Sequence, residues 1–146
     1  MIWVFYFIVV VTLLGTILLV SRKKSVKTQV TSFDLPLHID RSDFDNKNAE
    51  ILVLVFSSET CDGCDVVWNK TTVLQSSAVD VEKVSYQDVK GKKLHLKYQI
   101  EAVPSVLVCD EQGSVFKAFL GNVTATDLWA AVAELRGSQV EVCDSH

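Results

Sequence analysis

The chain has 146 residues, of which 14 are Lys or Arg and 18 are Asp or Glu, giving a formal net charge of −4. An acidic chain whose only basic cluster is Arg22-Lys23-Lys24 is poorly suited to nucleic-acid binding. Four cysteines are too few for a disulfide-rich scaffold, and six glycines with two prolines exclude a collagen-like or low-complexity chain.

The first segment is an uninterrupted uncharged run of 19 residues, Ile2 to Val20. As a helix it would span roughly 28 Å at about 1.5 Å per residue, close to the thickness of a bilayer's hydrocarbon core. The alternative is a cleaved signal peptide, but no charge precedes the run and Leu18-Leu19-Val20-Ser21 makes a poor cleavage site. We therefore interpret residues 1–24 as an uncleaved transmembrane anchor with a basic flank.

The basic triplet follows the apolar run, and the positive-inside rule places such clusters on the cytoplasmic side of a membrane. This predicts a single-pass membrane protein whose C-terminal domain faces the cytoplasm. Residues 25–32, with the sequence SVKTQVTS, are polar and lack apolar periodicity, which indicates a linker.

Residues 33–137 alternate between predicted strands and helices, which indicates an α/β domain with a mixed sheet. The apolar run Ile51 to Phe56 is typical of a strand buried on both faces. Thr124 and Asp127 fit a capping box, and Gly137 predicts the end of that helix at Arg136. In chain order we predict an edge strand at 35–39, a helical turn within 41–48, a strand at 51–56, a helix at 62–77, a strand at 79–86, a helix at 92–98, a hairpin of strands at 106–109 and 115–119, a helix at 124–136, and an acidic tail at 138–146.

A C-x-x-C motif, Cys61-Asp62-Gly63-Cys64, lies directly after the predicted central strand and begins a predicted helix. Free N–H groups and the positive end of the helix dipole favour a thiolate there, and the thiolate is the species that attacks disulfides. A zinc site would need further ligands with suitable spacing. The other cysteines and histidines are isolated in the sequence: His38, His95, Cys109, Cys143 and His146. The pattern favours a redox-active dithiol and no metal.

A second motif, Val103-Pro104-Ser105, follows Cys64 by 40 residues and precedes an apolar strand. Together the two motifs resemble the thioredoxin family. The matching stretches are ILVLVFSSETCDGC, KYQIEAVPSVLV and FLGNVTATDLWAAVAEL, within roughly residues 33–136. The resemblance implies a thioredoxin-like three-layer fold with a central mixed sheet. It also implies a cis peptide bond before Pro104, contact between Pro104 and the active-site disulfide, and pairing of the Val103 backbone with an extended substrate segment.

The chain departs from the thioredoxin pattern around the motif. Thr60 stands where the family has Trp, and Asp62-Gly63 replaces Gly-Pro. Asp65 replaces a basic residue, Val55 replaces a buried Asp, and Asn69 replaces the Pro of the active-site helix. We therefore expect a thioredoxin-like protein rather than a general thioredoxin.

Three other side chains favour structural interpretations. Trp68 lies on the same predicted helical face as the cysteines and is more typical of a core residue. Cys109 lies in an apolar strand, where a free cysteine behaves as a small hydrophobic residue. His95 is expected to be a surface or hydrogen-bonded histidine within a solvated helix face.

These observations predict a membrane-tethered thiol–disulfide oxidoreductase that reduces protein disulfides, in which Cys61 attacks and Cys64 resolves. Val103 and Pro104 would bind the substrate. The residues that flank the cysteines are Thr60, Asp62 and Gly63. We expect no cofactor beyond the dithiol; the expected partners are protein disulfides, an electron donor and the membrane, without nucleic acid. Two alternatives remain: a non-catalytic thioredoxin-fold interaction module of a membrane complex, and an extracytoplasmic disulfide reductase.

Overall fold

The structure of the chain is a computed structural model that describes residues 1, 3, 35–45 and 48–143. The chain divides into two units, Met1–Ser32 and Phe33–His146, and every strand named below belongs to the second. The predicted anchor and linker lie outside the described residues, apart from Met1 and Trp3. Among the residues that are described, none of the helices is long and apolar enough to cross a membrane.

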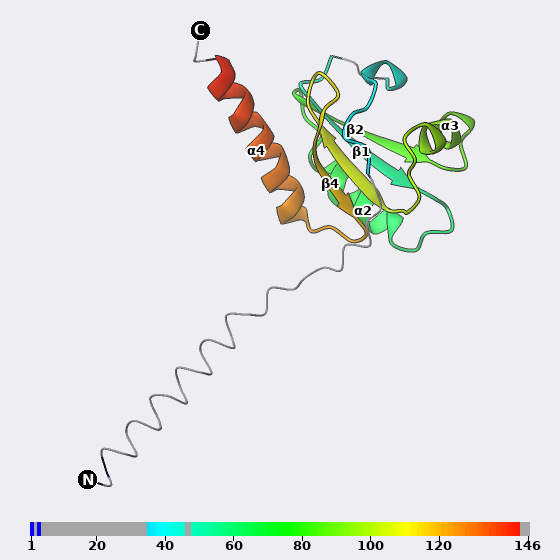
Figure 1. The fold of residues 1–146 in the computed structure, drawn as a ribbon. Helices are drawn as coiled ribbons and strands as arrows, with labels where there is room; N and C mark the ends of the chain where they lie inside the picture. Colours follow the sequence, from blue (N-terminus) through cyan, green and yellow to red (C-terminus); the bar gives the residue numbers. More distant parts are fainter. Residues whose placement is uncertain (2, 4–34, 46–47, 144–146) are drawn as a thin grey trace. The chain divides into compact units, whose positions relative to one another are not determined.

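The second unit is built on a four-stranded mixed sheet (Figure 1). Its described elements in chain order are η1 (Arg41–Asp43), β1 (Ile51–Ser57), α2 (Cys64–Thr72), β2 (Val79–Ser85), α3 (Val89–Lys97), β3 (Ser105–Cys109), β4 (Val115–Leu120) and α4 (Ala125–Cys143). The strand order is β2-β1-β3-β4. β1 pairs parallel with β2 and antiparallel with β3, and β3 pairs antiparallel with β4. The predicted mixed sheet is confirmed, and the predicted buried strand lies inside it.

Alternation of side chains along β1 divides the core into two layers. Ile51, Val53 and Val55 pack with residues of α2 and α4. Leu52, Leu54 and Phe56 pack on the other face with residues of α3 and of the segment around η1. All six side chains are fully buried, and each such burial contributes about 1.5–3 kcal/mol. A strand that is apolar on both sides thus requires helices on both faces, which gives a three-layer α/β/α arrangement.

The last helix, α4, begins as predicted but ends later. The Asp127 N–H donates to Thr124 Oγ1 at 3.1 Å, and the Thr124 hydroxyl donates to Asp127 Oδ2 at 2.6 Å. The predicted apolar stripe is buried and consists of Leu128, Val132 and Leu135. The end predicted at Arg136 is wrong, because α4 continues through Gly137 to Cys143. A glycine inside a helix costs only about 1 kcal/mol relative to alanine, too little to end this helix.

The other differences from the predicted elements arise from contacts distant in sequence. Instead of an edge strand, residues 35–39 make one isolated bridge, between His38 and Ser114. α3 begins before the predicted residue 92 and includes Gly91 in its first turn. A Cβ atom on Gly91 would lie 1.9 Å from the Ser85 carbonyl oxygen, so glycine allows α3 to pack directly against the end of β2.

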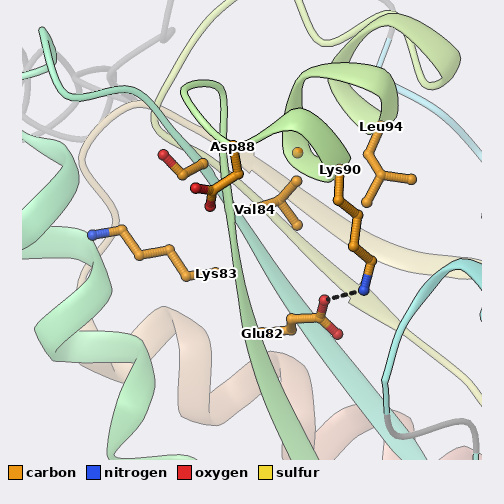
Figure 2. A pocket seen from close by; sticks show the side chains of 8 residues that line it. Glu82, Lys83, Val84, Asp88, Lys90 and Leu94 are labelled. Atoms are coloured by element: carbon orange, nitrogen blue, oxygen red, sulfur yellow. Dashed lines mark hydrogen bonds and ion pairs between the residues drawn. The ribbon is translucent and has the colours of Figure 1, made fainter.

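A small cavity of about 50 Å³ lies between β2 and the first turn of α3 (Figure 2). Lys90 Nζ lies 3.4 Å from Glu82 Oε1 and 2.8 Å from Asp45 Oδ1, so the charge of Lys90 at this cavity is paired with two carboxylates. Figure 2 shows Lys83 extending from the other side of β2, away from Lys90. Ligand pockets are usually about 300–1,000 Å³, and this cavity is therefore not a candidate site.

Candidate active site

Cys61 and Cys64 form a disulfide beyond the C-terminal end of β1, with their Cα atoms 5.5 Å apart. The helix predicted at 62–77, with Cys61 at its N-terminus, is shorter in the structure, because Gly63 is the N-cap of α2 and the helix runs from Cys64 to Thr72. Residues 61–64 form a turn in which the Cys64 N–H donates to the Cys61 carbonyl at 3.2 Å. Cys61 therefore belongs to the loop after β1, whereas Cys64 belongs to the helix.

The two cysteines differ in accessibility. Cys61 is half-buried, whereas Cys64 is only 2% exposed. The predicted flanking residues Thr60, Asp62 and Gly63 are all exposed. A thiol or disulfide that approaches from solvent can therefore reach the sulfur of Cys61 before that of Cys64.

The Val103–Pro104 motif lies at the same edge of the sheet. In the antiparallel pairing of β1 with β3, Phe56 is opposite Ser105, so the residues just before β3 lie beside the C-terminal end of β1. The Val103–Pro104 peptide bond is cis, Pro104 is buried, and its carbonyl accepts a hydrogen bond from the Gly121 N–H at 2.8 Å. The sheet thus brings two motifs that are distant in sequence to one end of the domain.

The position on β1 where thioredoxins carry a buried Asp is apolar in this chain. Val55 is fully buried and lies opposite Lys83 in the pairing of β1 with β2. The Lys83 ammonium lies 3.2 Å from Asp65 Oδ1 and 5.7 Å from the centroid of the Trp68 ring. Trp68 is partly buried against the core, which agrees with its structural interpretation. The acidic residue that follows the second cysteine is therefore ion-paired, a surface contact worth about 0–1 kcal/mol.

One residue at the site, Gln87, does not belong to either sequence motif. Gln87 lies just after β2, and its side-chain amide contacts the loop that leads from β1 to Cys61. The parallel pairing of β1 with β2 places the residues after both strands at one edge of the sheet. A search of the residues directly after the second predicted strand could have indicated Gln87, although its hydrogen bonds could not be predicted from the sequence.

Cys109 and His95 lie away from the disulfide. Cys109 is fully buried in β3, and burial raises the pKa of its thiol to about 12. His95 is also buried, and it donates from Nε2 to the Val84 carbonyl at 3.0 Å. Burial lowers the pKa of its imidazole. His95 is hydrogen-bonded as expected, but the helix face that includes it is not wholly solvated.

We predict that Cys109 resists alkylation in the folded protein. With a pKa of about 12, the thiolate fraction at about pH 8 is roughly 10⁻⁴, and the side chain is inaccessible. After reduction, iodoacetamide should modify Cys61 but leave Cys109 unmodified, as measured by peptide mass spectrometry. In concentrated guanidinium both cysteines should react. Rapid modification of Cys109 before unfolding would contradict its buried position.

The chain matches no protein-family model and no curated protein. Solved structures do resemble it. A malarial protein is 20% identical, with 57% of this chain and 94% of that chain covered and a TM-score of 0.52. Thioredoxin-2, described as a component of the malaria parasite protein secretion machinery, is 18% identical, with 62% and 88% covered and a TM-score of 0.54. Oxidised thioredoxin O2 from Arabidopsis thaliana is 18% identical, with 60% and 76% covered and a TM-score of 0.51.

These similarities define the class of the domain as an α/β domain with a thioredoxin-like fold. At this level of identity they establish the fold alone. The chemistry has to be inferred from the chain's own residues, and its distinguishing feature is the disulfide between Cys61 and Cys64 at the edge of the sheet.

Proposed function

We propose that the protein is a thiol–disulfide oxidoreductase that reduces protein disulfides. The observation that carries this proposal is the disulfide between accessible Cys61 and buried Cys64. In the reduced state, the Cys61 thiolate attacks one sulfur of a substrate disulfide, forms a mixed disulfide and releases the other sulfur as a thiolate. Cys64 then loses its proton and attacks Cys61, which releases the second substrate thiolate and forms the Cys61–Cys64 disulfide. An external electron donor returns two electrons, and the dithiol is the only redox group required.

Substrate binding is assigned to the Val103–Pro104 segment. Within the described residues, the Val103 backbone has no hydrogen-bond partner, although the segment adjoins the first residue of β3. Its N–H and carbonyl can therefore pair with an extended substrate chain, in the manner of strand addition. Such pairing would present a substrate disulfide at the edge of the sheet that holds Cys61.

The membrane attachment is a further part of the proposal. It is supported by the apolar run Ile2 to Val20 and by the basic triplet that follows it, which favours a cytoplasmic domain. A reporter fused after His146 should be active in the cytoplasm. Activity only on the other side of the membrane would favour the extracytoplasmic reductase instead.

The reductase proposal is tested by insulin reduction with the full chain in detergent micelles and dithiothreitol as electron donor. We expect turnover above the rate of dithiothreitol alone, and its loss in Cys61→Ser. The loss of the family's buried carboxylate at Val55 and of its Trp at Thr60 favours the alternative of a non-catalytic interaction module. That alternative predicts no turnover by the parent protein.

We predict a reducing potential for the Cys61–Cys64 pair, about −270 mV rather than about −120 mV. Asp62 is exposed and, in the part of the chain that the structure describes, has no cationic partner. Its charge disfavours a thiolate on Cys61 and so favours the disulfide. Equilibration with dithiothreitol should give this value, and Asp62→Asn should raise it by roughly 10–20 mV.

The matched control is Glu111→Gln, because Glu111 lies far from Cys61. Glu111 is in the loop that follows Cys109 at the end of β3, and Cys109 pairs with Leu52 near the N-terminal end of β1, whereas Cys61 follows the C-terminal end of β1. This substitution should leave the potential unchanged. A parent potential above roughly −180 mV, which is the range of disulfide isomerases, would contradict the assignment as a reductant.

A further inference from the structure

We propose that Gln87 is a positioning residue for the Cys61–Cys64 pair, a role that rests on the proposed redox function. Its side-chain amide joins the turn after β2 to the loop that carries Cys61. By restricting this loop, Gln87 holds the sulfur of Cys61 near that of Cys64 and shifts the redox equilibrium toward the disulfide.

Both the oxygen and the nitrogen of the Gln87 side-chain amide form hydrogen bonds. Its Oε1 accepts a hydrogen bond from the Glu59 N–H at 3.0 Å and from the Ser85 hydroxyl at 3.3 Å. Its Nε2 donates to Ser58 Oγ at 3.2 Å. Because the Glu59 N–H can only donate, the contact with Glu59 fixes which end of the amide is the oxygen. One side chain thus joins the end of β2 to two consecutive residues of the loop.

The contacts continue from Ser58 to Cys61. Ser58 Oγ lies 3.1 Å from Thr60 Oγ1 and accepts a hydrogen bond from the Thr60 N–H at 3.4 Å. The Ser58 carbonyl accepts from the Cys61 N–H at 3.1 Å. Ser58 is half-buried, whereas Glu59 and Thr60 are exposed. Residues 58–60 include no buried apolar side chain, so these polar contacts contribute to holding the loop in position.

The consequence for redox chemistry follows from the unequal surroundings of the two cysteines. Cys64 is buried at the start of α2, whereas Cys61 lies on the loop. In the dithiol state, movement of the loop therefore changes the separation of the two sulfurs mainly from the side of Cys61. Restricting that movement raises the effective concentration of one thiol at the other and favours closure of the disulfide.

The test is the equilibrium of the full chain, in detergent micelles, with glutathione. One protein dithiol and one oxidised glutathione give one protein disulfide and two reduced glutathione molecules. Samples are quenched in acid, alkylated and quantified by mass spectrometry of the peptide that holds Cys61 and Cys64. Gln87→Met keeps the length of the side chain but removes its donor and acceptor. It should lower the equilibrium constant by about fivefold.

The matched control is Gln75→Met at the other end of β2. Gln75 Oε1 accepts from the Val81 N–H at 2.8 Å, and its Nε2 donates to Asp80 Oδ1 at 2.9 Å, so the same kinds of bond are lost. A purely structural effect of losing an exposed glutamine would appear in both variants. We expect Gln75→Met to change the equilibrium constant by less than about twofold.

A second variant, Ser58→Ala, removes the hydroxyl that accepts from Gln87 and should shift the constant in the same direction. In the Gln87→Met background, it should have a smaller effect than it has alone. Equal shifts in Gln87→Met and Gln75→Met, or no shift in Gln87→Met, would overturn the positioning role. Insulin reduction tests the proposed function separately. If the parent protein reduces insulin but Gln87→Met leaves the equilibrium constant unchanged, the proposed function stands and only the positioning role of Gln87 is overturned.

Discussion

Replacement of Cys64 by serine should trap the protein in mixed disulfides with its substrates. Cys61 remains accessible on its loop and can still attack, but the buried sulfur that would displace the substrate is absent. An intramolecular thiol acts at a far higher effective concentration than a thiol in solution. Insulin turnover should therefore fall by at least about a hundredfold, while adducts sensitive to reducing agents accumulate on non-reducing gels.

The matched variant is Cys61→Ser, which should show neither turnover nor adducts, because the remaining Cys64 is buried. Cys109→Ser should leave adduct formation unchanged, since Cys109 lies in the core of β3. Cys143→Ser should also leave it unchanged, because Cys143 does not belong to the Cys61–Cys64 pair. If Cys61→Ser were the variant that accumulates adducts, the attacking and resolving roles would be reversed.

The absence of a carboxylate at Val55 bears on the resolving step. Val55 is fully buried among apolar side chains. Asp65, the acidic residue that directly follows Cys64 in α2, is paired with Lys83 at the surface. No buried acidic side chain occurs among the described residues. In the proposed reaction, the proton that leaves Cys64 when it attacks must therefore pass to solvent or to the leaving thiolate.

The features that could be predicted from the sequence depend on neighbouring residues. The apolar run at 51–56 predicted a strand buried on both faces, and the Thr124–Asp127 pair predicted a helix start; both are confirmed. Only two residues lie between Cys61 and Cys64, so the possibility of a disulfide was evident from their spacing alone.

The features that could not be predicted depend on contacts between distant segments. Gly91 in the first turn of α3 packs closely against Ser85 at the end of β2, and the bridge of Lys83 to Asp65 joins β2 to α2. The role of Gln87 requires knowing that β1 and β2 are parallel neighbours, which brings residue 87 beside residues 58 and 59. Neither the composition nor the hydrophobic periodicity of the sequence predicts which of these distant residues come into contact.

Replacement of Gly91 by alanine should have the largest effect on stability of the substitutions considered outside the cysteines. The new Cβ would lie 1.9 Å from the backbone oxygen of Ser85, and a backbone atom cannot turn away as a flexible side chain can. α3 must therefore move away from β2, which loosens the packing of buried Leu94. The free energy of unfolding should fall by about 2 kcal/mol, measured by guanidinium denaturation of the oxidised protein.

Gly137→Ala provides the matched control, because nothing lies within 4 Å of the position where its Cβ would be. In the interior of α4, alanine should raise the free energy of unfolding by up to about 1 kcal/mol. The two substitutions should therefore change the free energy of unfolding in opposite directions, although each adds the same methyl group to a helix.

Gly91→Ala should also lower the glutathione equilibrium constant, since moving the first turn of α3 displaces the adjoining turn that holds Gln87. Equal stability changes in the two variants would show that the contact between Gly91 and Ser85 does not fix the position of α3.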